Sequence, residues 1–273
     1  MIKRKQSAKN QYSPSSSLGQ VYRTIKTISK SLRHPRADWM LINRSSLSQA
    51  QEEEQLKKLF LHQGVDCVFD IGANNGQYAS KLRSRVDYHG KIFSFEPHPD
   101  AHKACLAAAG HDKDWHVEKI AISDKNGVLK FNLMEDTQFS SFSNPIATEV
   151  DLGYLGNKAT NQIEVKSETL YSCFNRLKEE YGFKRPFLKM DTQGYDSIVF
   201  LSGSEIIENF CGLQSELSIK RIYSSSIDFR DSIALYQNHG FELSALVPNN
   251  AGHFPDLIEL DCIMYRYLEM PRE

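Results

Sequence analysis

The most restrictive feature for the fold is a short apolar segment at residues 65–71, followed by two closely spaced glycines, Gly72 and Gly76. The mainly apolar run 65–71 is too short for a helix and is bounded by Gly64 and Gly72, so it predicts a buried strand. Gly72 and Gly76 remove side chains where the backbone must turn sharply or approach a ligand closely. The two asparagines between them tolerate turn dihedral angles and cap helices. We therefore predict a strand, a glycine turn and the start of a helix.

A second predicted strand indicates a nucleoside site. Residues 91–95 read as a strand that ends in Glu96 and Pro97. A carboxylate at this position can accept both hydroxyls of a ribose. A glycine turn after the first strand, with an acid about 20 residues later, is typical of adenosine sites on doubly wound sheets. We therefore expect Glu96 to bind a ribose.

Glycine spacing and one acidic residue distinguish between the adenosine cofactors. The nicotinamide fingerprint G-x-G-x-x-G is not met between Gly72 and Gly76, and the chain has no G-x-x-x-x-G-K-[ST] phosphate loop. Asp70 precedes the first glycine, where its charge would repel a diphosphate but suit a ligand with an ammonium and a sulfonium. S-adenosylmethionine is therefore favoured over NAD, FAD and ATP. The simpler alternative is a turn without a ligand, in which Asp70 caps a backbone group.

Composition and charge narrow the class of protein. The chain has 273 residues, enough for one large α/β domain with additions, and its net charge of -1 gives no indication of nucleic-acid binding. No apolar run is long enough to span a bilayer, and no apolar signal core follows the basic N-terminus, so we expect a cytoplasmic protein. The five scattered cysteines predict reduced thiols. His98 and His116 are expected to be capping or surface residues rather than bases.

The chain divides into three predicted parts. Residues 1–17 are basic and rich in serine and are expected to be a disordered tail. Residues 18–64 form a predicted helical extension, in which the apolar positions from Leu18 to Leu32 fall on one helical face. Packing or oligomer contact is favoured for this face over peripheral membrane contact. Residues 65–273 form the predicted cofactor-binding domain.

Strands and helices alternate through most of that domain. This order favours a mainly parallel sheet with helices on both faces, closed by an antiparallel pair. Segment 134–161 lacks periodicity and is predicted to be a substrate lid or insertion. The predicted helices are 48–62, 99–109, 168–181, 197–210 and 229–239, and the further strands are 115–122, 128–133, 186–191, 213–217, 241–247 and 257–267.

A second polar cluster follows the strand at 186–191. Lys189 and Asp191 alternate with Met190, so their side chains share one face of the strand. Ligands of open α/β sheets lie outside the carboxyl ends of the strands. A strand-end ion pair that only balances charge is the alternative, but folding of an otherwise apolar strand does not need two charges. We therefore predict a functional pair.

In these motifs the chain resembles the FkbM family of S-adenosylmethionine-dependent methyltransferases. The resemblance spans roughly residues 65–266 and rests on segments 70–76, 95–97, 121–124 and 188–196. It implies a Rossmann-like, seven-stranded class I methyltransferase fold and methyl transfer to a hydroxyl of a saccharide, glycolipid or polyketide. The family pattern K-x-D-x-E-G-x-E is altered here at Gln193 and Asp196, so no role of a carboxylate at position 193 is carried over.

The expected roles of the site residues follow from the motifs and the resemblance. Asp191 is predicted to accept the hydroxyl proton, and Lys189 to position the substrate or tune Asp191. Gln193 and Glu216 are predicted substrate contacts. No metal is expected; Asp191 and Glu216 would be the ligands of one. The predicted cofactor-binding residues are Asp70, Gly72, Ala73, Asn74, Gly76, Tyr78, Glu96, Pro97, Ala121, Ile122, Ser123 and Asp191.

Three other functions remain open beside O-methylation of a saccharide or glycan. One is N- or O-methylation of a polyketide or peptide. Another is a non-catalytic scaffold that recruits a partner through Leu18–Leu32, which Gln193 favours and the intact acids Asp70, Glu96 and Asp191 oppose. A nicotinamide oxidoreductase is disfavoured by the glycine spacing. The acceptor is expected to be a small molecule or glycan, and the sequence does not decide the oligomeric state.

Overall fold

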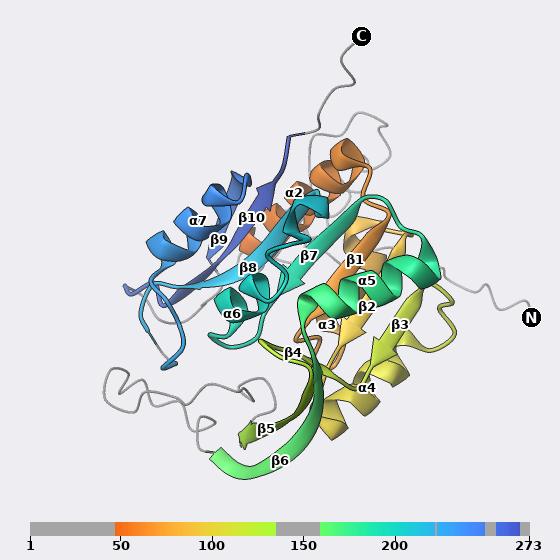
Figure 1. Ribbon diagram of the computed structural model, residues 1–273. Coiled ribbons are helices and arrows are strands. Elements are labelled where there is room, and N and C mark those ends of the chain that lie inside the picture. Colours follow the sequence, from red (N-terminus) through yellow and green to blue (C-terminus); the bar gives the residue numbers. More distant parts are fainter. Residues whose placement is uncertain (1–46, 135–158, 222, 249–254, 268–273) are drawn as a thin grey trace, which may run out of the picture. The chain divides into compact units, whose positions relative to one another are not determined.

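A seven-stranded sheet with the order β3-β2-β1-β7-β8-β10-β9 forms the centre of the computed structural model, which describes residues 47–134, 159–221, 223–248 and 255–267 (Figure 1). All neighbouring strands are parallel except the two antiparallel pairs that β10 makes with β8 and β9. The mainly parallel sheet and the closing hairpin are as predicted. The strands are β1 (Cys67–Ile71), β2 (Lys91–Phe95), β3 (Trp115–Glu118), β7 (Pro186–Met190), β8 (Gly212–Ser218), β9 (Glu242–Pro248) and β10 (Glu259–Tyr265).

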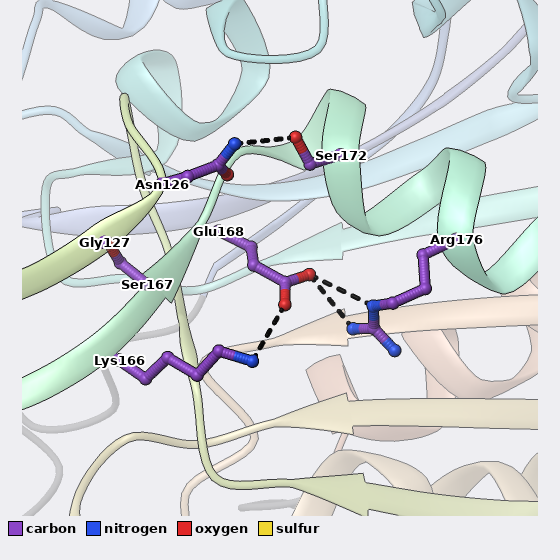
Figure 2. A pocket seen from close by; sticks show the side chains of 7 residues that line it. All are labelled: Asn126, Gly127, Lys166, Ser167, Glu168, Ser172 and Arg176. Atoms are coloured by element: carbon purple, nitrogen blue, oxygen red, sulfur yellow. Dashed lines mark hydrogen bonds and ion pairs between the residues drawn. The ribbon is translucent and has the colours of Figure 1, made fainter.

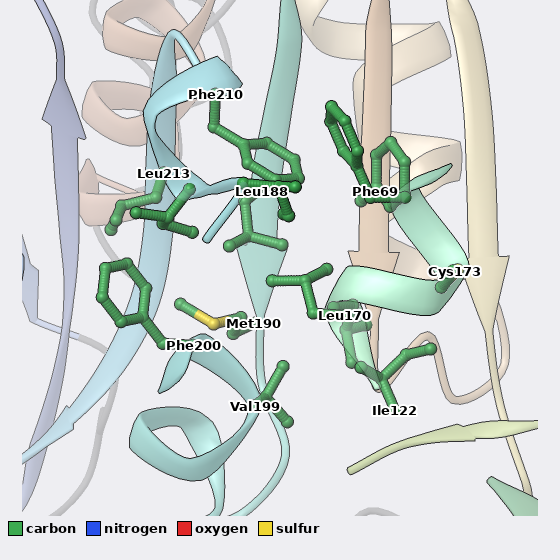
Figure 3. Close-up of a cluster of buried hydrophobic side chains, with 14 of the residues drawn as sticks. Phe69, Ile122, Leu170, Cys173, Leu188, Met190, Val199, Phe200, Phe210 and Leu213 are labelled. Atoms are coloured by element: carbon green, nitrogen blue, oxygen red, sulfur yellow. The ribbon is translucent and has the colours of Figure 1, made fainter. Parts of the chain in front are cut away.

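Alternating side chains of β1 explain why helices cover both faces. Cys67, Phe69 and Ile71 enter a core formed with the helices α5, α6 and α7, part of which Figure 3 shows. Val68 enters a second core with α2, α3 and α4. Every residue of β1 is buried, as a parallel strand between two helical layers requires. The helices are α2 (Leu47–Gln63), α3 (Gln77–Lys81), α4 (Pro99–Ala109), α5 (Leu170–Tyr181), α6 (Asp196–Leu201) and α7 (Phe229–Asn238), and α3 continues into a π-helical turn at Leu82–Val86.

Side-chain caps set the starts of three helices. The His98 ring accepts hydrogen bonds from the backbone N–H groups of Asp100 and Ala101 at the start of α4, where Pro99 occupies the first turn. Thr169 and Asp228 cap α5 and α7 in the same way. His98 is therefore a capping residue, as the sequence predicted.

The predicted strand 115–122 is wrong in its length, because the chain divides it between two sheets. β2 ends at Phe95, and the Glu96 N–H donates to the Glu118 carbonyl, so β3 has no further ladder partner. The next residues form β4 (Ala121–Ile122) in a small sheet with the order β4-β6-β5 (Figure 1). Its other strands are β5 (Gly127–Met134) and β6 (Ala159–Glu168).

Two other predicted boundaries also need correction. The predicted lid 134–161 contributes its first residue to β5 and its last three to β6, and residues 135–158 lie outside the described part. The predicted helix 197–210 is broken into α6 and a 3-10 turn at Ile207–Asn209. Gly203 lies in the segment between them, where an added Cβ would lie 2.7 Å from the Leu170 side chain, so this close contact with α5 requires glycine.

Among the described residues, no helix is long and apolar enough to cross a membrane. The predicted tail 1–17 and the helix at Leu18–Leu32 lie outside the described residues. All five cysteines are free and buried, in keeping with the predicted reduced thiols.

Candidate functional site

The glycine turn is held against the ends of two neighbouring strands. The N–H groups of Gly72 and Ala73 both donate to the Phe95 carbonyl at 3.1 Å. Gly72 has φ 77, and a Cβ there would lie 2.0 Å from the backbone oxygen of Asp191. Only glycine fits, because the angle is left-handed and the carbonyl is part of the backbone. The turn thereby brings the ends of β1, β2 and β7 together.

Glu96 presents a buried carboxylate beside this turn. Its Oε2 accepts the Asn74 N–H at 2.7 Å, and its Oε1 accepts the His98 N–H at 2.7 Å. Burial raises the Glu96 pKa to about 7, although both backbone hydrogen bonds lower it. Each carboxylate oxygen has two acceptor sites, so one site on each oxygen remains for a further donor. A pair of ribose hydroxyls matches that acceptor set.

Asp70 lies beneath the turn rather than on its surface. Its carboxylate is fully buried and accepts the Ser94 hydroxyl at 3.0 Å, and Ser94 in turn accepts the Trp115 indole N–H at 3.0 Å. Lys189 Nζ lies 3.4 Å from Asp70 Oδ1, within ion-pair distance but outside hydrogen-bond geometry. The structure therefore gives Asp70 a supporting position, and direct cofactor contact stays a prediction.

Lys189 connects the turn to the end of β7. Its buried Nζ lies 3.3 Å from the Gly72 carbonyl oxygen, 3.4 Å from Asp70 and 3.5 Å from Asp191 Oδ2. Burial lowers the Lys189 pKa, but the charges of Asp191 and Asp70 outweigh that effect and raise it overall. The ammonium is therefore held between two carboxylates. Of the two predicted roles, tuning of Asp191 fits this position better than contact with an acceptor.

The structure brings together four predicted residues at the carboxyl ends of β7 and β8. Besides the Lys189 contact, Asp191 Oδ1 accepts a hydrogen bond from Gln193 Nε2 at 3.0 Å. The same nitrogen donates to Glu216 Oε2 at 3.2 Å. The Asp191 side chain is 39% exposed, whereas that of Lys189 is 7% exposed. Asp191 is thus the charged group of this pair that an acceptor can reach.

Tyr223 joins this group although its sequence context gives no signal. Its hydroxyl donates to Gln193 Oε1 at 2.8 Å from the segment between β8 and α7. That segment has neither the periodicity nor the glycine spacing that marks the other motifs. Only the fold brings Tyr223 across 30 residues to the Gln193 side chain.

Asp196 is a second residue whose structural role the sequence did not show. It is buried at the start of α6 and accepts the Thr192 N–H at 2.8 Å, the Ser215 hydroxyl at 2.9 Å and the Glu216 N–H at 3.2 Å. Burial raises its pKa. Asp196 therefore holds the turn after β7 against β8.

The remaining predicted cofactor residues include the buried residues of β4 and Tyr78. Ala121, Ile122 and Ser123 are buried in and after β4, which begins three residues beyond Glu118, the partner of Glu96. The Tyr78 hydroxyl points into the core and donates to Gln214 Oε1 at 3.0 Å. Cofactor contact by the β4 residues, Pro97 and Tyr78 stays a prediction.

A separate hollow of about 330 Å³ lies between β6 and α5, as Figure 2 shows. Its charges are balanced internally: Arg176 bonds both Glu168 and Glu118, and Lys166 lies 3.2 Å from Glu168. No predicted site residue lines it, so we place the functional site at the glycine turn. The hollow is lined by Asn126, Gly127, Lys166, Ser167, Glu168, Ser172 and Arg176.

A glycine turn after β1, a buried carboxylate after β2 and a charged cluster after β7 define the class of doubly wound enzymes that bind an adenosine cofactor. Within this class, the family model described as the methyltransferase FkbM domain matches residues 70–243. The chain belongs to the FkbM methyltransferase family.

Individual relatives are more distant. A 2-O-methyltransferase, NoeI, of Sinorhizobium fredii is 26% identical over 190 residues, which cover 66% of this chain and 74% of the relative. The crystal structure of an FkbM methyltransferase from Methylobacillus flagellatus superposes with a TM-score of 0.43 at 10% identity, covering 90% of this chain and 60% of that one. Magnesium protoporphyrin IX methyltransferase from Synechocystis gives a TM-score of 0.45 at 8% identity, covering 94% and 100%.

Family membership confirms the predicted enzyme class and cofactor. The protein is an S-adenosylmethionine-dependent methyltransferase. The residues present fit this cofactor, because the remaining acceptor site on each Glu96 carboxylate oxygen matches a ribose diol. Lys189 balances Asp70, so the fit does not depend on an unpaired buried charge.

Proposed function

We propose that the protein methylates a hydroxyl group of a saccharide, either free or as part of a glycan or glycolipid. The observation that carries this proposal is the partly exposed Asp191 carboxylate beside the glycine turn. The Asp191 N–H donates to the carbonyl of Ile71 at 3.1 Å, so Asp191 lies next to the glycine turn that begins at Gly72. Similarity to a 2-O-methyltransferase supports oxygen as the methyl acceptor.

The cofactor would be held by residues from three strand ends. Glu96 would accept the ribose hydroxyls, the turn at 72–76 would hold the methionine part, and Ala121–Ser123 would border the adenine. Bound S-adenosylmethionine would supply a methyl group from its positively charged sulfur to the acceptor oxygen, leaving S-adenosylhomocysteine as the second product. Asp70 and Lys189 would support the turn from below through their ion pair and the Lys189 bond to the Gly72 carbonyl.

Asp191 would accept the proton of the acceptor hydroxyl. An alcohol is a poor nucleophile near neutral pH, and a positioned base typically contributes about 10²–10⁴-fold to the rate. The Lys189 ammonium lies 3.5 Å from Oδ2, and the Asp191 side chain stays partly exposed. The other contribution to the rate comes from holding the acceptor oxygen close to the methyl group and in line with it.

Transfer of a labelled methyl group tests this function. The acceptors are the methyl glycosides of glucose, galactose, mannose, fucose and rhamnose, alongside a peptide and a polyketide alcohol. We expect transfer to a glycoside. We also expect Asp191→Asn to lower turnover by about 100-fold or more, with the S-adenosylhomocysteine Kd unchanged in calorimetry. Asp231→Asn on the exposed surface of α7 is the matched control.

Two results would contradict the proposal in different ways. Transfer to the peptide or polyketide and to none of the glycosides would assign another acceptor class. A rise in the S-adenosylhomocysteine Kd equal to the fall in turnover of Asp191→Asn would make Asp191 a cofactor-binding residue rather than a base.

A further inference from the structure

The two oxygens of the Asp191 carboxylate have different partners. Oδ2 lies 3.5 Å from the Lys189 ammonium, and Oδ1 accepts the Gln193 amide at 3.0 Å. The first partner is a buried charge on the same strand. The second is a neutral side chain on the turn that follows it. A carboxylate held at both oxygens has a fixed orientation, which a proton acceptor needs.

The Gln193 amide is oriented by groups on both of its ends. Its nitrogen carries two hydrogens, and the carboxylates of Asp191 and Glu216 account for both. Its oxygen accepts the Tyr223 hydroxyl at 2.8 Å. The reverse orientation would place the amide oxygen against two carboxylates, so the network determines which atom is the nitrogen.

The backbone at this position is also constrained. Gln193 has φ 53, a left-handed angle that is uncommon for a residue with a side chain. The segment that carries Tyr223 packs directly on the turn: the Ser225 hydroxyl donates to the Gly194 carbonyl at 2.7 Å, and a Cβ at Gly194 would lie 2.3 Å from Ser226 Oγ. Backbone strain of this kind persists where the surroundings enforce it and is concentrated at functional sites.

We propose that Gln193 and Tyr223 are positioning residues that orient the Asp191 carboxylate and separate it from the carboxylate of Glu216. This inference rests on the proposed role of Asp191 as the base. Gln193 acts through its hydrogen bond to Oδ1, and Tyr223 acts through Gln193. The amide places a donor between two acids that would otherwise repel one another. This role places Gln193 behind the base, and the predicted contact of Gln193 with the substrate stays a prediction.

Other titratable groups face Asp191. Lys189 lies on its own strand, and the remaining groups come from β1, β8 and β10, from α6 and from the segment after β8. They are Asp70, Asp196, Glu216, Tyr223, Glu259 and Asp261, of which only Tyr223 is changed in one of the variants. Because each variant below leaves all the carboxylates and Lys189 in place, a change in the Asp191 titration is due to residue 193 or 223.

The test follows the Asp191 carboxyl directly and needs no acceptor. Protein labelled with carboxyl-¹³C aspartate is titrated by NMR, and the Asp191 signal is the one absent from Asp191→Asn. Gln193→Met keeps the length of the side chain and leaves the left-handed backbone angle occupied by a residue with a side chain, but it removes the amide that donates to Asp191. We therefore expect the midpoint of the Asp191 titration to rise by about one pH unit. Gln193→Glu adds a third carboxylate, and we expect a larger rise. Tyr223→Phe should raise the midpoint less than either.

Gln237→Glu on the exposed end of α7 is the matched control and should leave the midpoint unchanged. Thermal unfolding verifies that each variant is folded at the titration temperature. An Asp191 midpoint that stays the same in folded Gln193→Met and Gln193→Glu would overturn the proposal. A shifted midpoint combined with full turnover of Asp191→Asn would instead reject Asp191 as the base and leave the positioning of its carboxylate intact.

Discussion

Single residues at the strand ends place ionisable groups in buried positions, and at Glu96 this burial removes water from a carboxylate. Its carboxylate is almost fully enclosed, and two backbone donors offset only part of the lost hydration. The side chain is therefore held in a form that favours protonation when no ligand is bound. In the proposed complex, the ribose hydroxyls of the cofactor would add donors to this carboxylate.

The Glu96 pKa predicts how stability of the ligand-free protein varies with pH. Its folded pKa of about 7 lies above the ordinary value of 4.5, so the folded state binds the proton more tightly. Stability from this group is present at low pH and is lost as the pH rises through that interval, by about 1.4 kcal/mol per pH unit at most. Glu96→Gln removes this dependence. Urea unfolding at several pH values should show a flatter profile for the variant, and parallel profiles would contradict the prediction.

Gly72 gives a second prediction at this scale. Gly72→Ala places a methyl group 2.0 Å from the Asp191 carbonyl oxygen, at a left-handed φ. We expect a loss of about 3 kcal/mol or more in the free energy of unfolding. Gly182→Ala also has a left-handed φ but nothing within 4 Å, so it should cost only about 1 kcal/mol. Equal losses in urea unfolding would show that the contact with Asp191 is unimportant.

The sequence predicted the charged pair after β7 but not the function of each charge. Alternation along the strand places Lys189 and Asp191 on one face, and the structure confirms it. The burial of Asp70 depends on Ser94 and Lys189, which are distant in sequence and meet it only across strand pairs. Local patterns carry no information about such cross-strand partners, so the sequence did not show the supporting position of Asp70, and its contact with the ligand stays a prediction.

Among the elements, α2 is joined to the site by a polar contact as well as by its apolar face. Glu52 of α2 is buried, contacts Lys81 of α3 and accepts the Gln214 amide at 2.8 Å. Gln214 in turn accepts the hydroxyl of Tyr78, whose ring lies 5.3 Å from Lys189 Nζ. The helix before the glycine turn therefore supports the far side of the site.

Removal of the Glu52 carboxylate should weaken this support. Glu52→Ala leaves Lys81 and Gln214 without their acceptor, and we expect a loss of about 2–4 kcal/mol in the free energy of unfolding. Glu54→Ala on the exposed face of the same helix breaks only an i,i+4 pair with Lys58 and should cost less than about 1 kcal/mol. Urea unfolding of both variants checks the difference. Similar losses would mean that α2 is held by its apolar residues alone.

Helices and strands were predictable where local sequence signals mark them. They were less predictable where pairing with distant strands determines the bounds of an element. The bounds of β2 and α4 agree with the predicted ranges because Pro97, His98 and Pro99 mark them in the sequence. β3 and β4 read as one strand, because only the lack of a partner beyond Phe95 separates them. β6 has no clear alternation at its start, and its pairing with β5 defines it.

For the whole molecule, the buried thiols give a test of global packing. All five cysteines are enclosed, and burial raises the thiol pKa of Cys67, Cys105, Cys173, Cys211 and Cys262. We expect native protein to react slowly with a disulfide reagent and all five thiols to react at once in guanidinium. Rapid reaction of any thiol in native buffer would show that its part of the core opens locally.

The strand order has a consequence for synthesis of the chain. β1 lies between β2 and β7, and its register with β7 joins Cys67 to Pro186 and Ile71 to Met190. One edge of β1 therefore lacks its partner until a ribosome has released the segment that contains β7. Such a distant pairing slows folding and exposes an unpaired strand edge in the meantime. Nascent chains stalled before Pro186 should bind a chaperone that recognises extended apolar segments, and chains stalled well beyond β8 should have released it.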